Sequence, residues 1–534
     1  MNHPCVITLD RRSAPRALFS GDRIVEVDLP PGTRVLYPKS PLAPLKDPDA
    51  AIRYALHHPY GTEPLYAKLR PGMKVVIAVD DISLPLPPMK APDVRERVLT
   101  IVLQLLADHG VDDVEIIIAT SVHRRMTGPE VRHIVGDKIF NAWWPKRLYN
   151  HDAEDPKGMA FVGETSLGER VVLNKKAVES DLIIYVNLNL VPMDGGHKSV
   201  AVGLCGYESL KPHHNPRVLR KCHSYFDPPA SELNTVVERM GRVAQQHLNI
   251  FTIETTVNNR MFDRPLAFLA KNEDDHTAAE RAALKALCYT LDRTPDDVRD
   301  QIFRRVPAPY ELTGVWAGAT ESVHPHTLKR CFEQYAVPLE GQADILVAGI
   351  PYISPYNVNA YLNPLLVQVL AQGYLFNMYR GVPVVKKGGT MIITHPCKDR
   401  FDPEQHAPYV EFVHRLLPET RDALELHRKY EEDFARNPSY LAMYRRGNAY
   451  HPAHPFFMWY WGEAGRQHLG RVIVVGAEND YIPKLLGYET ARSMPEALDM
   501  ARDTAPPSPD ITCLHVPPIA MADVTLPKAR GDRA

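Results

Sequence analysis

The sequence has little that marks a disulfide-bonded, membrane-spanning or nucleic-acid-binding protein. Its seven cysteines are odd in number and scattered, and no CxxC pair occurs, which argues against a disulfide framework or a thiolate zinc site. The first residues, MNHPCVITLDRR, lack a signal-peptide core, and no apolar run approaches the roughly 18 residues of a membrane helix. The net charge of −2 provides no basic surplus for nucleic acid or an anionic membrane. We therefore expect a reduced, cytoplasmic protein with neither of these partners.

Glycine is not abundant either, at 30 residues, whereas proline is, at 48 of 534. That is about 9%, against an average near 5%. Hydrophobic residues make up 45% and charged residues 24%, which is normal for a globular protein and excludes a mainly disordered chain or a coiled coil. Many prolines in a chain that still has a core predict stiff, ordered loops. At roughly 150 residues per domain, the length fits three units or two large ones.

The first half alternates predicted strands and helices. Residues 74–79 and 181–187 are continuous apolar runs, as in strands that are covered on both faces. Residues 93–109 carry an apolar stripe of helical period, and 114–120 form the next strand. A second helix starts at Thr127 and Glu130, which have capping-box spacing, and we expect Gly136 to end it. This order predicts an α/β domain with a mostly parallel sheet.

The second half repeats this alternation, so the predicted fold is two α/β domains with mostly parallel sheets and an active-site cleft between them. Predicted strands are residues 344–349, 390–394, 472–476 and 510–516, and predicted helices are 274–291, 359–379, 405–417, 419–435 and 495–503. We expect an N-terminal cofactor-binding domain over residues 1–270, a C-terminal domain over 271–520 and a polar tail over 521–534. The boundary falls in a charged stretch at 271–275.

Ligands in open α/β sheets lie beyond the carboxyl ends of the strands. Three loops of the first domain follow such ends, namely residues 80–87, 121–125 and 187–216. The second loop places His123 directly after a buried strand, where it can be a general base or a loop histidine held by backbone groups. Asp80 and Asp81 can bind a metal or simply begin a proline-rich turn.

The third loop contains Gly195-Gly196-His197-Lys198 and, further on, His213 and His214. The glycines allow close approach of a ligand. The lysine suits a counter-ion or a nucleophile for a covalently held cofactor, and the imidazoles suit nickel, copper, zinc or iron. A glycine turn with a solvated lysine remains the alternative. No P-loop, no G-x-S-x-G elbow and no HExxH motif occurs.

Taken together, these loops resemble the nickel-dependent lactate racemase family of 2-hydroxyacid racemases and epimerases. The resemblance rests on VVIAVDDISLPLP (75–87), residues 116–137, residues 150–187 and GGHKSVAVGLCGYESLKPHH (195–214), with weaker matches at 349–362 and 384–393. The resemblance implies a nickel-pincer nucleotide, a pyridinium mononucleotide whose carbon and two sulfurs hold nickel. It also implies cofactor-synthesis proteins as partners and a small-molecule substrate. The oligomeric state stays open.

The family pattern gives roles to individual residues of this chain. Lys198 would join the cofactor covalently, and His214, sixteen residues later, would be the protein ligand to nickel. His123 would be the catalytic base that takes the substrate hydroxyl proton while hydride moves to the cofactor. We further expect Asp81, Ser83, Gly195, Gly196 and His197 to bind the cofactor.

This sequence departs from the family at several polar positions. The second catalytic histidine falls on Leu188 by ungapped counting, and the arginine of the first proline loop falls on Leu84. A glutamine and a lysine of the second domain fall on Leu362 and Leu365. Substrate contacts are therefore expected from these four positions, from Tyr356, and from Arg124 and Arg125 as the remaining cations.

The sequence thus predicts an isomerase, a racemase or epimerase of a 2-hydroxyacid-like substrate that is larger or more apolar than lactate. Two alternatives stay open. One is the same cofactor used for one-way hydride transfer or for epimerisation of a sugar acid, and the other is a non-catalytic cofactor-binding protein.

Overall fold

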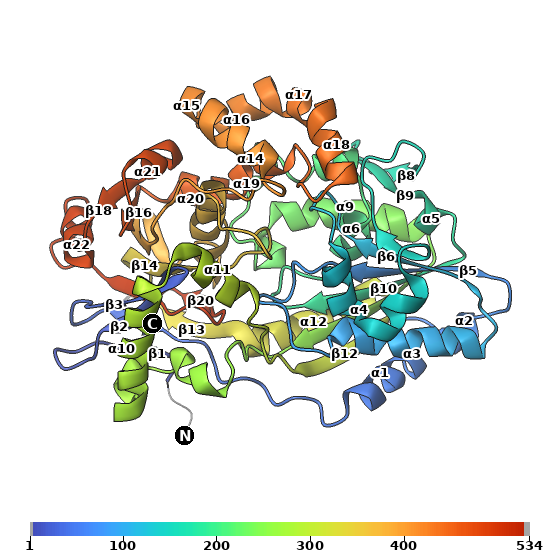
Figure 1. The fold of residues 1–534 in the computed structure, drawn as a ribbon, viewed down its shortest axis with the longest axis horizontal. Coiled ribbons are helices and arrows are strands. Elements are labelled where there is room, and N and C mark those ends of the chain that lie inside the picture. Colours follow the sequence, from blue (N-terminus) through green and yellow to red (C-terminus); the bar gives the residue numbers. More distant parts are fainter. Residues whose placement is uncertain (1–3, 528–534) are drawn as a thin grey trace, which may run out of the picture.

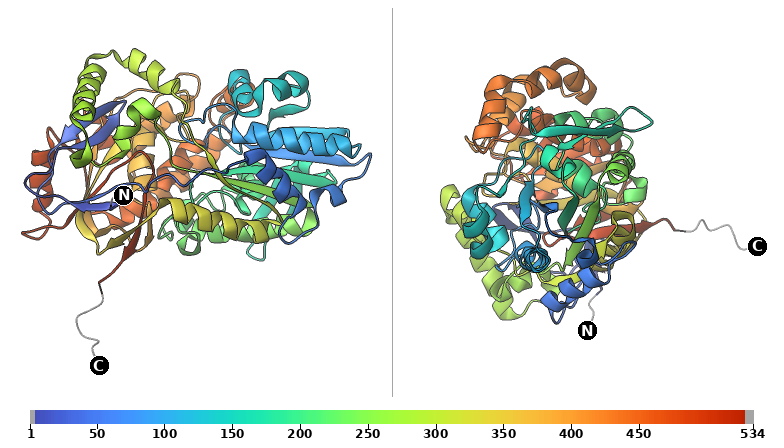
Figure 2. Two further views of the ribbon diagram at one scale, coloured as in Figure 1. Left: turned by 90° about the horizontal axis from the view of Figure 1, so that it is seen from below. Right: turned by 90° about the vertical axis from the view of Figure 1, so that its right-hand side faces the viewer.

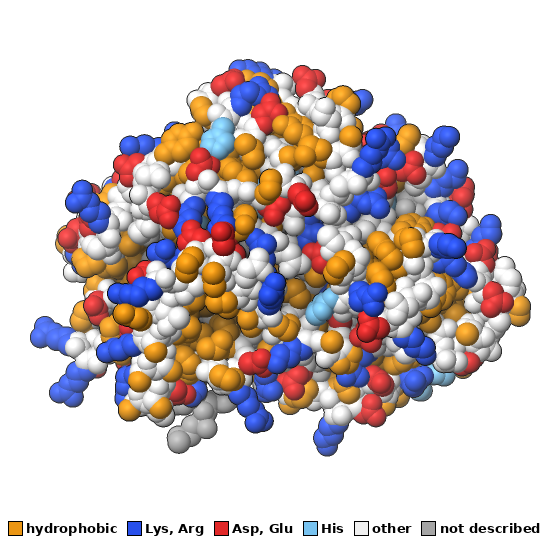
Figure 3. Space-filling model, in the orientation of Figure 1, with side chains coloured by type: hydrophobic (Ala, Val, Ile, Leu, Met, Phe, Trp, Pro, Cys, Tyr) orange, Lys and Arg blue, Asp and Glu red, His pale blue; other side chains and the backbone are white. Residues whose placement is uncertain are grey.

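Two α/β layers lie side by side in the structure, a computed structural model that describes residues 4–527 (Figure 1). Each layer is a mostly parallel sheet covered by helices, which confirms the predicted fold class. None of the helices in residues 4–527 combines the length and the apolar character that crossing a bilayer demands. On the face shown in Figure 3, Lys and Arg side chains are interspersed with Asp and Glu.

The first sheet has six strands, and all neighbouring pairs are parallel except the pair β11–β12. In spatial order they are β12 (Leu312–Gly318), β11 (Ile250–Val257), β10 (Leu182–Asn189), β5 (Lys74–Asp80), β6 (Asp113–Ala119) and β7 (Leu148–Asn150). Residues 75–79 are buried throughout, as their unbroken apolar run predicts. Helix α3 (Val94–Asp108) packs on β10, and α12 (Thr320–Tyr335) packs on β11 and β12.

Helix α4 (Gly128–Trp143) begins with the predicted capping box, in which Glu130 accepts a hydrogen bond from the Thr127 backbone N–H at 2.8 Å. The expected stop at Gly136 is confirmed, because this residue has a φ of +78° and breaks the helical backbone. A second helical segment follows directly and runs to Trp143. The glycine is required there because a Cβ would lie 2.2 Å from the Glu96 carboxylate.

The second sheet has nine strands and includes the N-terminal end of the chain. Its main path is β1 (Val6–Thr8), β4 (Arg34–Leu36), β19 (Ile511–Leu514), β14 (Ala343–Pro351), β16 (Val385–Thr394), β17 (Arg471–Val475) and β18 (Glu489–Ala491). Strand β2 (Arg16–Gly21) pairs with the end of β14 and with β3 (Arg23–Val27). Seen from below in Figure 2, α10 (Ala278–Arg293) covers these N-terminal strands and lies against β3.

Sheet membership therefore does not follow the expected division at residue 270. Residues 6–36 belong to the second sheet because β4 pairs with β19, and β12 and α12 belong to the first sheet although they follow residue 271. The expected polar tail over 521–534 is also wrong in its first part. Met521–Thr525 form β20, which pairs with β13 (Ala336–Glu340) and β15 (Tyr379–Gly381). Residues 528–534 of that tail lie outside the described residues.

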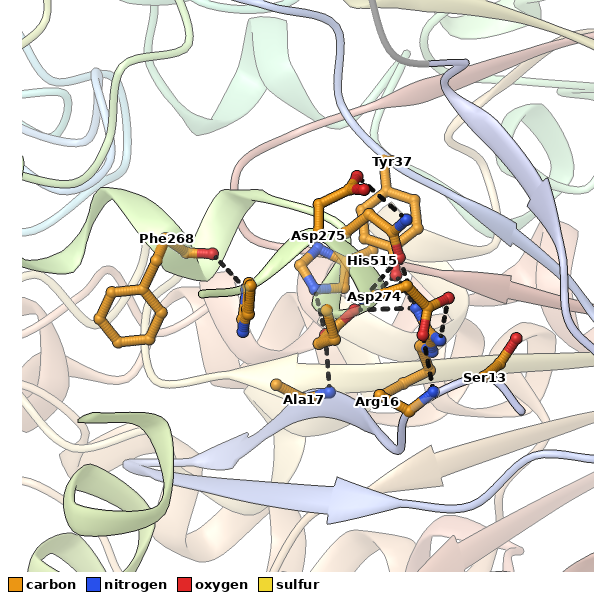
Figure 4. Close-up of polar contacts among 12 residues, drawn as sticks. Ser13, Arg16, Ala17, Tyr37, Phe268, Asp274, Asp275 and His515 are labelled. Carbon is orange, nitrogen blue, oxygen red and sulfur yellow. Dashed lines mark hydrogen bonds and ion pairs between the residues drawn. The ribbon is translucent and has the colours of Figure 1, made fainter. Parts of the chain in front are cut away.

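A buried ionic cluster ties the N-terminal strands to the rest of the second layer (Figure 4). Arg16 is fully buried and donates to Tyr37 Oη at 2.9 Å, Asn272 Oδ1 at 2.7 Å and Asp274 Oδ2 at 2.8 Å. Glu273 lies 3.2 Å from the same guanidinium and 3.1 Å from His515 Nε2. The residues that directly follow His515 line the cavity described next, so this cluster anchors one of its walls.

Candidate functional site

One cavity of about 230 Å³ lies between the two sheets. Each sheet faces this cavity at the point where its strand order reverses. In the first sheet the chain runs from β5 to β6 and β7 on one side and returns to β10 on the other side. In the second sheet β16, β17 and β18 extend from one side of β14, whereas β19 lies on the other. Crevices at such switch points are the usual ligand sites of open α/β sheets. Residues after β5, β10, β14 and β19 all line this cavity.

His123 is held by the aspartate that follows β5. Asp81 Oδ2 lies 2.8 Å from His123 Nδ1, and Asp81 Oδ1 accepts the Ser83 N–H at 2.9 Å and the Ser83 hydroxyl. Burial opposes ionisation of Asp81, but the histidine and Ser83 outweigh it and hold the pKa of this carboxyl below its usual range. Because Nδ1 faces a carboxylate, it carries the proton, and Nε2 of His123 is left as a base.

Asp80 also lines the cavity but already has three donors. Its carboxylate accepts from Asn187 Nδ2 and the Leu188 N–H, both at 2.8 Å, and from Tyr185 Oη at 3.0 Å. Burial raises the pKa of Asp80 to about 7, against the effect of these donors. This carboxylate therefore orders the end of β10 rather than binding a metal with Asp81.

Lys198 enters the cavity from the start of α6 (Lys198–Gly203), two residues after the glycine pair. Its Nζ donates to Met193 O at 3.2 Å and lies 3.7 Å from Asp194 Oδ1. The side chain is 28% exposed, so the amine is accessible from the cavity. Asp194 is buried, and its other oxygen accepts the Leu190 and Val191 N–H groups.

Both glycines before Lys198 have positive φ, 83° at Gly195 and 64° at Gly196. Glu254 of β11, which is fully buried, accepts the Gly196 N–H at 2.6 Å and contacts His324 Nδ1 at 3.1 Å. A Cβ on Gly195 would lie 2.4 Å from Asn189 Oδ1, and one on Gly196 2.8 Å from His324. Only glycine fits both positions, and the Glu254–His324 pair fixes the loop from behind.

His214 lines the cavity with its ring stacked on Trp461 of α19 (His454–Trp461), at a centroid separation of 5.4 Å. Its Nδ1 lies 2.7 Å from His213 Nδ1. Burial, followed by the charges of His213 and Lys198, holds the pKa of His214 well below its ordinary value. A neutral imidazole with Nε2 still available is the form that binds a metal.

The second layer contributes a largely apolar wall opposite these polar groups. Tyr356 lies edge-on to His123, with ring centroids 5.5 Å apart, and its hydroxyl is 3.0 Å from the Tyr374 hydroxyl. Burial raises the pKa of Tyr356 to about 12. The residues of this wall are Pro351, Ile353, Ser354, Pro355, Tyr356, Leu370, Tyr374, Leu375, Met378, Trp461, Val516, Pro517 and Ile519.

The structure brings most of the predicted site residues together. His123, Lys198, His214, Asp81, Ser83, Gly195, Leu84 and Tyr356 all line the cavity. Gly196 supports the loop from outside it, and His197 points away, with Nε2 3.3 Å from Glu321 of α12. The expected cofactor contact of His197 thus does not agree with its position.

Five expected substrate contacts lie outside this cavity. Arg124 is buried against Glu130 at 2.6 Å and Val358 O at 2.9 Å, so its charge is already paired. Leu188 and Leu365 are fully buried in the core, and Leu362 lines a smaller neighbouring cavity. Arg125, too, is absent from the described residues that line the main cavity. The cationic substrate clamp expected from the two arginines is therefore not formed.

Sequence reasoning missed Glu254, His324, Asp194 and Trp461. Glu254 and His324 come from β11 and α12, which were not predicted, and only long-range pairing reveals them. Asp194 had a local signal, since it directly precedes the glycine pair. Trp461 belongs to the aromatic run 456–461, which is indistinguishable from core in the sequence and is in fact buried.

The model of the lactate racemase N-terminal domain family matches residues 20–224. This segment contains His123, Lys198 and His214. Over these residues the chain is similar to the N-terminal domain of lactate racemases. The lactate racemase of Lactiplantibacillus plantarum is 26% identical over 169 residues, which cover 31% of this chain and 38% of that protein. The lactate racemase of Thermoanaerobacterium thermosaccharolyticum is 24% identical over 172 residues, 30% of this chain and 37% of that one.

The sequence likeness is thus confined to less than two fifths of each curated relative, whereas the structural likeness extends further. The lactate racemase apoprotein of Thermoanaerobacterium thermosaccharolyticum superposes with a TM-score of 0.61 and 18% identity over 96% of this chain and all of that chain. A protein of Thermotoga maritima gives a TM-score of 0.50 and 13% identity over 91% of this chain and all of that chain. These likenesses establish a common fold.

Proposed function

We propose that this protein is a nickel-pincer-dependent racemase or epimerase of a 2-hydroxyacid-like substrate other than lactate. The observation that carries the proposal is the convergence of Lys198, His214 and His123 on one cavity between the two switch points. These residues come from separate loops, and the resemblance gives each of them a role. The matched family model supports the general racemase class.

The residues of the cavity fit the cofactor at its two points of attachment. Lys198 offers an accessible amine on a rigid glycine loop, and His214 offers a neutral imidazole in an aromatic surround. The described residues contain no group of three or more His, Cys, Asp or Glu side chains placed to bind a metal ion on their own. One imidazole, that of His214, would complement soft sulfur and carbon donors from an organic group that carries nickel. When bound, the cofactor supplies a reversible acceptor of hydride.

His123 performs the proton transfer in this proposal. Asp81 holds Nδ1–H, so Nε2 would take the proton from the substrate hydroxyl and would return it to the same oxygen. Tyr356, with its raised pKa, keeps its proton at neutral pH and can donate a hydrogen bond to the substrate oxygen, but it is not a base.

A second candidate function follows from Leu188. This position, where the family pattern has a second catalytic histidine, is buried and points into the core. Among the described lining residues, His123 is then the one imidazole that is not assigned to nickel. A single base on one side favours one-way hydride transfer as the alternative to racemisation.

The test is to co-express the protein with the cofactor-synthesis proteins that we propose as its partners. Intact-mass and peptide mass spectrometry should find an adduct on Lys198, and metal analysis should find nickel. Lys198→Ala should abolish the adduct, whereas Lys221→Ala, an exposed lysine of the same region, should not. Chiral chromatography of a hydroxyacid panel then separates the two candidates, because only racemisation produces both enantiomers from either one. Absence of adduct and nickel would contradict the proposal.

A further inference from the structure

The cavity is divided chemically between the two layers. The ionisable groups, including Asp81, His123 and Lys198, come from loops of the first sheet. The described residues that the second layer contributes include no Lys, Arg, His, Asp or Glu. The polar side-chain groups of that wall are the hydroxyls of Ser354, Tyr356 and Tyr374 and the indole N–H of Trp461.

The rest of the wall is a continuous apolar surface. Leu375 ends the helical stretch 364–375 and Met378 follows it, Val516 and Ile519 follow β19, and Leu233 of α9 (Glu232–His247) adds apolar lining from the first layer. Apart from the partly buried Ile519, these side chains are all buried. Pockets of this kind fix a ligand by a few polar groups and gain affinity from apolar surface. A methyl group, the side chain of lactate, would leave most of this surface facing water.

A second anionic group on the substrate is disfavoured at the same place. Asp80, Asp81 and Asp194 line the cavity, and Lys198 is the one lysine or arginine among its described lining residues. Its Nζ lies 3.7 Å from Asp194 Oδ1, and in the proposed function this nitrogen is used to join the cofactor, so it would not be free to pair with a second anionic group. A buried carboxylate without a cationic partner is costly, so an acidic side chain has no favourable position against this wall.

We infer that the substituent on the reacting carbon of the substrate is an extended apolar group, alkyl or aryl, which binds to the second-layer wall. The inference rests on the proposed function for the hydroxyacid head of the ligand and adds the chemistry of its tail. It separates this site from those for lactate and for hydroxy dicarboxylates.

The experiment compares the binding of three 2-hydroxyacids that differ only in the substituent on the reacting carbon. Lactate, 2-hydroxyoctanoate and malate are titrated calorimetrically into protein that has been co-expressed with the cofactor pathway. Each methylene that is fully buried should tighten binding roughly fourfold. We expect 2-hydroxyoctanoate to bind at least 10-fold more tightly than lactate, and malate to bind no more tightly than lactate.

One variant and a matched control test where the apolar substituent binds. Met378→Gln keeps the length of the side chain and adds an amide, and it should weaken 2-hydroxyoctanoate about 5-fold to 10-fold while changing lactate less than twofold. Met443→Gln is the matched control on exposed helix α18 (Pro438–Arg446) and should change neither. If Met378→Gln does not fold, as circular dichroism will show, the chain-length series on the unmodified protein still decides.

The outcomes separate this inference from the proposed function. Binding that tightens with alkyl chain length, but with no nickel, no adduct on Lys198 and no turnover, would support the inferred apolar substituent. The same result would contradict the proposed reaction. Suppose instead that the protein racemises lactate or malate and binds 2-hydroxyoctanoate no more tightly than these acids. That result would support the proposed reaction and would contradict the inferred apolar substituent. A cavity that binds none of the three acids also overturns the inference.

Discussion

Replacing Glu273 by glutamine tests the buried cluster that anchors the wall after β19. Glu273 accepts the Ala17 N–H at 2.8 Å, the Tyr37 hydroxyl at 2.5 Å and the Arg16 guanidinium at 3.2 Å. Its side chain is 3% exposed. Burial alone would raise its pKa, but His515, Tyr37 and the Ala17 N–H lower it from 4.5 to about 2.

That pKa difference sets the size and sign of the effect. A carboxyl whose pKa is lower in the folded than in the unfolded state stabilises the fold fully above its unfolded pKa. The contribution is lost as the pH falls from 4.5 through about 2. At about 1.4 kcal/mol for each tenfold change in acidity, the carboxylate contributes roughly 3 kcal/mol at neutral pH. Removing one partner of a buried ion pair costs about 3–5 kcal/mol, which is consistent.

The assay is urea denaturation of the unmodified protein and of Glu273→Gln at pH 7, 5, 4 and 3, using the first unfolding transition. We expect a loss of roughly 3 kcal/mol at pH 7 that shrinks steadily below pH 4.5. Glu179→Gln, which removes an exposed pair with Lys175, is the control and should change stability by less than about 0.5 kcal/mol. A loss that is the same at pH 7 and pH 3 would refute the reasoning, since it would not depend on the charge.

Three further predictions concern the site. His123→Ala should lower the rate of substrate interconversion by about 10²–10⁴-fold, and Asp81→Asn should lower it less and shift its pH profile, both measured by chiral chromatography. Gly196→Ala should cost about 1–3 kcal/mol, seen as a lower thermal midpoint, because its φ is positive and the added Cβ has no room. Arg124→Met should cost about 3–5 kcal/mol in urea denaturation by stranding Glu130, with no specific rise in KM; a rise in KM without a loss of stability would restore it as a substrate residue.

The sequence predicts those elements whose burial is continuous or whose caps are local. Strands β5, β10 and β14 are buried on both faces, so their apolar runs are unbroken, and α4 begins where its capping box indicates. Strand β11 escapes prediction because Thr252, Glu254, Thr255 and Thr256 interrupt its apolar pattern. Those polar side chains are tolerated inside because each has a buried hydrogen-bond partner, such as Thr320 for Thr252 at 2.7 Å.

The site divides in the same way. Lys198 and His214 lie sixteen residues apart on one stretch of chain, so the resemblance to a known family could relate them without knowledge of the fold. The Glu254–His324 pair and the apolar wall depend on pairings between distant segments, which no local pattern specifies. For Arg124, the local sequence pattern is misleading. Its position beside His123 suggests a cation that binds the substrate, but it forms a buried ion pair with Glu130, the capping residue of the next helix.

The division of labour between the two layers follows from their topology. At a switch point, neighbouring strand ends lead in opposite directions and leave a crevice, and this protein sets two such crevices against each other. The first supplies the loops with the ionisable groups, and these loops have fixed hydrogen-bond partners such as Asp81 for His123 and Glu254 for the glycine loop. The second has to supply only shape and apolar contact. Its residues can therefore differ without disturbing the ionisable groups, so this chain combines the lysine and histidines of the first sheet with an apolar wall from the second.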